Sequence, residues 1–339
     1  MERIRAAIIG YGRNGSTMHA GAIEATADFV LTAACDIDPT RRDEARNRFG
    51  CRVYDDYQRM LRAEKLDLVC VVTRSDQHAE MVCACLEAGV NVLVTKPWAL
   101  DAEEAERMLR VRDSTGKLLL PWLPARWGCD FRRVRELVRA GAVGRVFFIR
   151  RAVSSFGTRS DWQTERRFGG GYLLNWGPHI VEPPLLVGDS PVRSAFGRLR
   201  RTINPGDAED MFFALLTLEN GTMLQAEYTV SAETLPSWIV QGTAGTIAVY
   251  GTRLVLRSTS PARPEDPTRT TTMDASGARV AEEELEGAIY GDEKEIYREL
   301  APVLRGQRPF PVRGEDALEL TRVLDAIRTS DAEDRLVRL

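Results

Sequence analysis

The first 125 residues alternate short apolar runs with segments of helical spacing, and this alternation restricts the fold more than any other feature. Short strands separated by helices of roughly 10–15 residues predict right-handed βαβ units and a parallel sheet. The longer runs are continuous in Val, Ile and Leu, as expected when helices cover both faces of the sheet. We therefore predict a doubly wound α/β domain over 1–124, with strands at 5–9, 29–35, 51–53, 66–72, 91–94 and 118–122 and helices at 16–25, 39–49, 54–62, 77–88 and 101–113.

After Pro124 the pattern changes. A helix at 131–140, a strand at 146–154 and a glycine-rich turn that opens a helix at 169–186 come first. Strands then follow one another without helices between them, which predicts an antiparallel sheet and an α+β domain over 125–339. The Asn-Gly pair at 220–221 is a strong hairpin signal. The expected strands are 192–200, 211–218, 222–229, 238–241, 246–250 and 253–257, followed by a polar surface excursion at 258–284 and helices near 293–304 and 315–330.

Composition excludes several classes of protein. With 46 basic and 49 acidic residues in 339, the formal net charge is −3, which gives no electrostatic footprint for nucleic acid. No run of about 18 apolar residues predicts a membrane span. The N-terminus enters an apolar strand without a signal-peptide pattern, so we expect a cytoplasmic protein. The six cysteines include no Cys-x-x-Cys pair, which predicts free thiols and no metal site.

A glycine-rich segment, Gly-Tyr-Gly-Arg-Asn-Gly at 10–15, directly follows the first expected strand and opens a helix. In this context the motif predicts a Rossmann dinucleotide site, because the glycines permit a tight turn and the helix N-terminus faces the phosphates. Asp36 ends the second strand, 21 residues past Gly15, where a carboxylate would bind the ribose of NAD. Arg41 and Arg42 are close enough to accept a 2′-phosphate, so NAD is favoured and NADP stays possible. A plain glycine turn with a helix-capping Asp is the alternative. The predicted cofactor contacts here are Gly10, Gly12, Arg13, Asn14, Gly15, Asp36 and Arg41.

Two further segments carry groups suited to acid–base chemistry. Lys96, one of only four lysines, lies at the end of the fifth expected strand, where open α/β sheets bind ligands. Its ammonium would stabilise a developing alkoxide, or would simply be a solvated head on a buried stem. Asn175 and His179 lie four residues apart, on one face of the expected helix. Histidine is the natural acid–base group near neutral pH, although a lone helical histidine is more often structural.

Together these residues resemble the Gfo/Idh/MocA oxidoreductases, the glucose–fructose oxidoreductase and inositol dehydrogenase family. The resemblance covers nearly the whole chain and rests on the glycine motif, Thr-Arg-Ser-Asp-Gln-His at 73–78, Lys-Pro at 96–97 and the Gly-Gly-Gly…His segment at 169–179. The pairs Arg-Trp at 126–127 and Asp-Phe at 130–131 also look like the start of the second domain in one large subgroup. The resemblance implies a Rossmann domain joined to an α+β domain with a large, mostly antiparallel open sheet that often forms the oligomer interface.

The resemblance also implies roles for individual residues. Lys96 and His179 would be the catalytic pair, with Asn175 beside them, and Thr73, His78, Lys96 and Pro97 would line the cofactor site. Thr95 and Asn175 depart from the family pattern, which usually has Glu and Asp there; an amide cannot accept a proton, so base duty falls on His179. Glu182 stands for a common Asp, or is a salt-bridged helix carboxylate, and His19 is expected to pack. The predicted substrate contacts are Arg126, Trp162, Tyr172, Asn175, His179 and Tyr290.

The leading hypothesis is NAD(P)-linked interconversion of a secondary alcohol and a ketone on a sugar or cyclitol, by a homodimer or homotetramer. A second hypothesis is a redox-neutral sugar enzyme that eliminates, hydrolyses or epimerises through a transient keto sugar and keeps its NAD bound. A third is an NAD-sensing regulator, which would need neither Lys96 nor His179.

Overall fold

In the computed structural model, which describes residues 2–259, 268 and 277–339, the chain forms two compact units. The first consists of 1–124 with 161–175 and 292–325, and the second of 125–160, 176–291 and 326–339. The sequence prediction assigns 161–175 and 292–325 to the second domain, but these segments pack with the first 124 residues. Their contacts arise from tertiary packing, which no local pattern encodes. The division of labour between a cofactor domain and a substrate domain stays a prediction.

The first unit is built on a six-stranded parallel sheet with the order β3-β2-β1-β4-β5-β6. This order confirms the predicted doubly wound sheet, whose switch point lies between β1 and β4. Most positions in β1 and every position in β4 are buried, which explains the continuous apolar runs. The strands are β1 Ile4–Ile9, β2 Phe29–Cys35, β3 Arg52–Tyr54, β4 Leu68–Val71, β5 Asn91–Val94 and β6 Leu119–Pro121.

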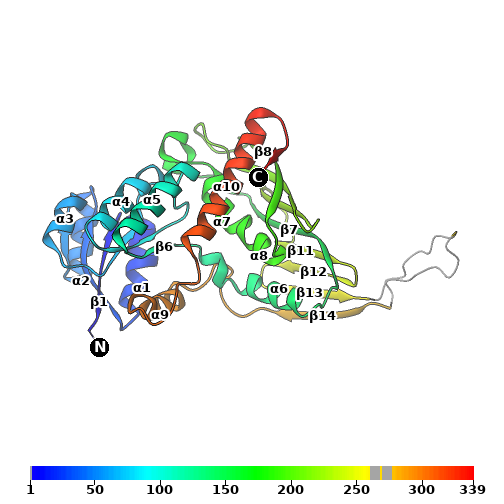
Figure 1. Ribbon diagram of the computed structural model, residues 1–339, viewed down its shortest axis with the longest axis horizontal. Helices are drawn as coiled ribbons and strands as arrows, with labels where there is room; N and C mark the ends of the chain where they lie inside the picture. The colour runs from blue at the N-terminus through cyan, green and yellow to red at the C-terminus, as the bar shows by residue number, and fades with distance from the viewer. Residues whose placement is uncertain (1, 260–267, 269–276) are drawn as a thin grey trace. The chain divides into compact units, whose positions relative to one another are not determined.

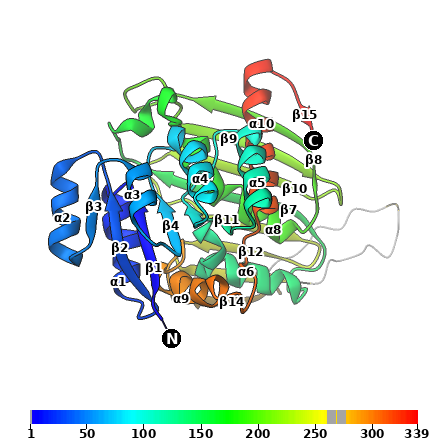
Figure 2. The same cartoon turned by 60° about the vertical axis from the view of Figure 1, so that its left-hand side comes forward.

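Aspartate caps and glycine ends set the helix limits in this unit. Asp38, Asp56 and Asp101 each accept a backbone N–H of the first turn, and Gly50 and Gly116 end α2 and α5 in the left-handed conformation. Helices α4 and α5 pack side by side, as do α1 and α9 (Figures 1 and 2). The helices are a π-helical turn at Gly15–His19 continued by α1 Ala20–Glu24, then α2 Pro39–Phe49, α3 Tyr57–Ala63, α4 His78–Glu87, α5 Ala102–Thr115 and α9 Glu293–Leu304, with short 3-10 turns at Ser75–Gln77, Trp162–Thr164 and Arg166–Phe168.

The second unit is built on a nine-stranded sheet with the order β14-β13-β12-β11-β7-β10-β9-β8-β15. β7 and β10 run parallel and the other pairs are antiparallel, which confirms the predicted mostly antiparallel sheet. The strands are β7 Val146–Ser155, β8 Val192–Arg200, β9 Met211–Leu218, β10 Met223–Val230, β11 Trp238–Gly242, β12 Gly245–Tyr250, β13 Arg253–Ser258, β14 Arg279–Glu284 and β15 Val337–Arg338. The helices are a 3-10 turn at Pro124–Trp127, α6 Cys129–Arg139, α7 Tyr172–Ile180, α8 Glu182–Gly188 and α10 Gly314–Glu333, of which α7 and α10 each continue from one unit into the other.

Two edge strands were not predicted. The expected excursion at 258–284 is wrong at its end, because 279–284 forms β14, while its residues 260–267 and 269–276 lie outside the described part of the chain. β14 has almost no buried side chain and is held by cross-strand charges, such as Arg253 Nη2 to Glu282 Oε2 at 2.7 Å, so it lacks the alternation that marks a strand.

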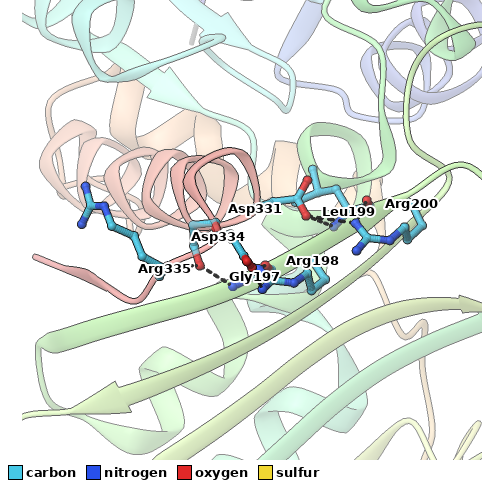
Figure 3. A network of polar contacts seen from close by, with 8 residues as sticks. Gly197, Arg198, Leu199, Arg200, Asp331, Asp334 and Arg335 are labelled. Atoms are coloured by element: carbon cyan, nitrogen blue, oxygen red, sulfur yellow. Dashed lines mark hydrogen bonds and ion pairs between the residues drawn. The ribbon is translucent and has the colours of Figure 1, made fainter.

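The short strand β15 follows a network of polar contacts between the end of α10 and β8 (Figure 3). The Gly197 amide donates to Ser330 Oγ at 2.9 Å, the Leu199 amide donates to Asp331 at 3.1 Å, and Arg198 pairs with Asp334. A Cβ at Gly197 would lie 2.6 Å from Ile327, so only glycine lets the helix approach this closely. No helix in the part of the chain that the structure describes is long and apolar enough to cross a membrane.

A buried polar chain joins three elements of the first unit. His19 Nδ1 lies 2.9 Å from the Tyr297 hydroxyl of α9, which lies 3.2 Å from Cys70 Sγ of β4. The His19 ring also packs against Trp122, with centroids 4.8 Å apart. These contacts confirm the packing role expected for His19 and explain why α9, far along the sequence, belongs to this unit.

We expect acid to destabilise the first unit through His19. Burial lowers the pKa of His19 from 6.5 to about 4, so below pH 6.5 the unfolded chain binds a proton that the folded chain refuses. The stabilisation by neutral His19 is therefore complete above the unfolded pKa and is lost as the pH falls toward the folded pKa, by about 3 kcal/mol in all. Urea unfolding at pH 7 and 4.5 should show the native protein losing about 2–3 kcal/mol more than His19→Gln. Equal losses would contradict this.

Candidate functional site

Glycine occupies three positions in the first loop, and the steric reason differs from one position to the next. A Cβ at Gly10, where φ is +91°, would lie 2.7 Å from the Val72 carbonyl oxygen, and one at Gly15 would lie 2.1 Å from the Gly10 oxygen. Both glycines are therefore required by the fold itself. At Gly12 the nearest atom is Arg41 Nη1 at 3.4 Å, the end of a flexible side chain. Because packing does not demand glycine at 12, the bare backbone there fits the close approach of a pyrophosphate.

Asp36 and Arg41 lie beside this loop. Asp36 follows β2 directly and is 6 % exposed; its Oδ1 accepts the Asp38 amide at 2.9 Å, and its Oδ2 lies 3.5 Å from Arg41 Nη1. Arg42 instead donates to the backbone oxygens of Asp36 and Ile37, at 2.8 and 2.9 Å. The structure thus separates the two arginines: Arg42 holds the turn, and Arg41 stands between Gly12 and the carboxylate. Arg13 and Asn14 lie in the loop between the glycines, where Arg13 supplies its carbonyl to the Thr17 hydroxyl at 2.6 Å.

His78 joins the ends of β4 and β5. Its ring nitrogens lie 2.7 Å from the Pro97 oxygen and 3.1 Å from the Thr73 oxygen, and the residue is 1 % exposed. Burial lowers the pKa of His78, against the opposing effect of the two carbonyls. His78 therefore fixes the backbone of Thr73 and of the cis Lys96-Pro97 peptide, which is the packing role left open by the sequence.

Lys96 is held by the first part of α7. Its ammonium donates to Asn175 Oδ1 at 2.6 Å and to the Asn175 carbonyl at 3.0 Å. The preceding residue, Thr95, donates its hydroxyl to the Val71 carbonyl of β4 at 3.2 Å, so it links the ends of β4 and β5. The structure thus brings together two of the three predicted catalytic residues, although 79 residues separate them in the chain.

Three glycines, two of them closely packed and one with a positive φ, precede Asn175. A Cβ at Gly169 would lie 2.4 Å from Leu100 and 2.8 Å from Ser75, and one at Gly170 would lie 2.6 Å from two backbone oxygens. Gly171, with φ of +111°, turns the chain into α7. Gly169 therefore fits the segment against residues that follow β4 and β5, and Gly170 lets the segment fold back closely on its own residues 163 and 165.

His179 lies one helical turn after Asn175 on α7, within the second unit. It is 7 % exposed, and its ring centroid lies 5.0 Å from that of Tyr290 and 5.9 Å from that of Trp176. Trp176 in turn packs against Tyr228, with centroids 5.3 Å apart. Burial is the largest cause that raises the pKa of Tyr290, so this phenol stays protonated near neutral pH. Sequence reasoning missed Trp176 and Tyr228; the i, i+3 spacing of Trp176 and His179 was the available signal.

Arg126 is committed to a buried ion pair. Its Nε lies 2.7 Å from Glu182 Oε1, and the two side chains are 12 % and 4 % exposed. Glu182 is therefore the salt-bridged helix carboxylate of the alternative reading. The substrate contact predicted for Arg126 stays a prediction. Its guanidinium already has a carboxylate partner in the structure.

The remaining predicted substrate contacts divide between the units. Tyr172 is 6 % exposed and Trp162 half-buried, both in the first unit, whereas Tyr290 is in the second. The structure therefore brings Tyr290 to His179 and leaves the roles of Trp162 and Tyr172 as predictions. Among the described residues, no group of three or more His, Cys, Asp or Glu side chains lies where it could hold a metal ion.

Comparison with known proteins identifies the family. A family model described as an oxidoreductase family with an NAD-binding Rossmann fold matches residues 4–121, and the GFO/IDH/MocA C-terminal domain matches 131–248. The chain belongs to the Gfo/Idh/MocA oxidoreductase family. It is accordingly an NAD(P)-dependent oxidoreductase whose Rossmann domain binds the nicotinamide cofactor.

Individual relatives span the whole chain or most of it. A scyllo-inositol 2-dehydrogenase (NADP(+)) of Bacillus subtilis is 24 % identical over 100 % of this chain and 97 % of its own. A D-glucoside 3-dehydrogenase of Escherichia coli is 29 % identical over 66 % of this chain and 69 % of its own. The crystal structure of an NAD-binding protein from Listeria innocua superposes with a TM-score of 0.85 at 25 % identity, covering 99 % of this chain and 97 % of that one.

We predict that Asp36 and Arg41 set the preference between NAD and NADP. Asp36→Ala should weaken NAD binding about tenfold, because a charge-assisted hydrogen bond to the ribose is lost, and should leave NADP binding unchanged or tighter. Arg41→Ala should weaken NADP more than NAD. Arg46→Ala, an exposed residue of the same helix paired with Asp43, is the matched control. Quenching of protein fluorescence measures the dissociation constants of NAD and NADP for each variant. Equal effects of Asp36→Ala on both cofactors would overturn the assignment of Asp36 to cofactor preference.

Proposed function

We propose that this oxidoreductase interconverts a secondary alcohol and a ketone on a sugar or cyclitol, with Lys96 and His179 acting on the same oxygen. The observation that carries the proposal is that the Lys96 ammonium donates two hydrogen bonds to Asn175, which lies one helical turn before His179 on α7. Side chains four residues apart share a helix face, which supports a shared role for Asn175 and His179 at the substrate.

The residues around the glycine loop fit a dinucleotide. The Gly12 backbone and the helix N-terminus after it would hold the pyrophosphate, and Asp36 would hold the ribose. When bound, the nicotinamide exchanges a hydride with the substrate carbon. Thr73, Lys96 and Pro97 lie at the ends of β4 and β5, on the carboxyl edge where such sheets bind ligands, and His78 keeps these ends together.

The protein supplies the proton chemistry. In the oxidation direction, His179 takes the hydroxyl proton while the Lys96 ammonium stabilises the charge that grows on the oxygen. In the reduction direction, His179 returns the proton to the same oxygen. Asn175 cannot accept a proton, so its part is to orient Lys96 with two oxygen acceptors.

The substrate class is supported by the aromatic surroundings of His179 and by the names of the relatives. Trp176, Tyr228 and Tyr290 pack around or next to the imidazole, and aromatic faces with hydroxyl groups suit polyhydroxylated rings. The related enzymes are named for an inositol and a glucoside. We place the activity in the cytoplasm as part of the proposal, with six free thiols in support.

Replacing the acid–base group should separate catalysis from binding. We expect His179→Asn to lower turnover by about 10²–10⁴-fold, since general acid–base catalysis is worth that much, while the dissociation constant for the nicotinamide stays within about twofold. Lys96→Met should also lower turnover, and Lys96→Arg should recover part of it. Steady-state kinetics on a panel of sugars and cyclitols, with cofactor titrations, measure both quantities. A fully active His179→Asn enzyme would exclude this residue as the base.

The second candidate is a redox-neutral reaction, which Asn175 favours because an amide cannot accept a proton at a position where the family resemblance implies an Asp. Such an enzyme must keep its nicotinamide bound between half-reactions. Denaturing the freshly purified protein and identifying released nicotinamide by chromatography distinguishes the two. Stoichiometric cofactor supports recycling in place, whereas release of reduced cofactor at each turnover rules it out.

We infer that the protein is a homodimer or homotetramer through the uncovered face of the large sheet. In β9 every second residue is buried, while Phe213 and Leu215 on the other face are partly exposed. On the same face, Arg150 and Glu227 form an ion pair across neighbouring strands. Apolar side chains on an open sheet face favour association. Light scattering should give at least twice the 37.9 kDa chain mass, and a monomer would overturn the inference.

A further inference from the structure

The second unit contains a pocket to which none of the predicted residues except Tyr290 belongs. Its volume is about 340 Å³, and it is lined by the end of β7, by the segment 231–237 after β10, and by residues 289–290. β7 and β10 run parallel here, so the pocket lies where both strands end. Sites for small molecules begin at about this size.

Tyr290 connects the pocket to the acid–base histidine. Its side chain lines the pocket, and its ring centroid lies 5.0 Å from that of His179. Tyr290 therefore contacts both the proposed acid–base residue and the pocket.

The accessible charge of the pocket is negative. Arg151 lines it but is only 2 % exposed; its Nη1 lies 3.1 Å from Asp130 Oδ2, and its guanidinium stacks 4.9 Å from the Trp238 ring. That cation is neutralised and buried. Glu233, in contrast, is exposed and accepts the Thr234 amide at 3.1 Å. A phosphate, a uronate or a nucleotide diphosphate would meet a carboxylate here without an accessible cation to bind it.

The other lining groups suit a hydroxylated ring. Ser154, Ser231 and Thr234 contribute hydroxyl groups. Phe156 is 74 % exposed although it is aromatic, and Leu235 beside it is 37 % exposed. An exposed aromatic face among hydroxyl groups offers apolar contact to the C–H face of a sugar and hydrogen bonds to its edges.

We propose that this pocket is a subsite for a second, non-anionic sugar or cyclitol ring of the substrate, with Glu233 recognising an amine on that ring and Phe156 stacking on its face. The proposal rests on the proposed function, since it extends the substrate from the ring at His179 to a glycoside. It excludes sugar phosphates and nucleotide sugars as preferred substrates.

Calorimetric titration of the NAD-saturated protein with β-1,4-linked probes tests the subsite. The probes are D-glucose, cellobiose, the disaccharide of glucosamine and cellobiouronic acid. We expect the amino disaccharide to bind tightest, cellobiose tighter than glucose, and the uronate weaker than cellobiose. Glu233→Gln should weaken the amino disaccharide about fivefold and leave cellobiose unchanged, which is the size expected for an exposed charge pair. Phe156→Ala should weaken both disaccharides and leave glucose unchanged.

The matched controls are Glu219→Gln, an exposed glutamate in the hairpin turn, and Phe147→Ala, a 41 % exposed phenylalanine at the opposite end of β7. Neither should alter any affinity. The subsite is overturned if the uronate binds as tightly as cellobiose, if no disaccharide binds more tightly than glucose, or if the controls act like the pocket variants. His179-dependent turnover of any sugar or cyclitol would leave the proposed function standing in those cases, whereas absence of such turnover would remove the function itself.

Discussion

The two hydrogen bonds from Lys96 to Asn175 are the interaction on which the arrangement of the site depends. They tie the end of β5 to the start of α7, and thereby join residues that are 79 positions apart. The close packing of Gly169 supports this contact, because a side chain there would strike Leu100 and Ser75, which follow β5 and β4. Both acceptors are uncharged oxygens, one of an amide side chain and one of a backbone carbonyl, so these two hydrogen bonds orient the ammonium without themselves bringing an opposite charge to it.

Several conspicuous polar residues have a buried partner within the fold. Arg126 is paired with Glu182, Arg151 with Asp130, and His19 with Tyr297. Leaving one member of such a buried pair alone is strongly unfavourable, so these groups are fixed once the units fold. Buried charge at a site is therefore a poor guide to ligand charge in this protein. What a ligand meets is set by the smaller number of polar groups that remain at the surface.

The sequence predicted the features that depend on neighbouring residues. Continuous apolar runs, aspartate caps and the glycine loop all act within a few positions, and the sheets, most helices and the family followed from them. Strand β14 was not predicted because it pairs with β13 through charged side chains and has no buried face. Sequence patterns also did not predict that 161–175 and 292–325 pack with the first 124 residues. This packing depends on contacts between distant positions, such as that of Tyr297 with His19. The aromatic cluster at His179 is of the same kind, since Trp176, Tyr228 and Tyr290 come from three separate segments.

Residues that the fold explains can be separated from those that it does not. Gly10 and Gly15 are required by backbone atoms that a side chain would strike, so their presence would be expected with or without a ligand. Gly12 meets no such atom, and Phe156 is an aromatic residue left exposed beside a pocket. Selection for stability alone gives no reason for either, because a glycine costs conformational entropy and an exposed aromatic gains nothing from burial. Gly12 and Phe156 are therefore the residues on which the proposed pyrophosphate contact of the first unit and the proposed subsite of the second unit depend.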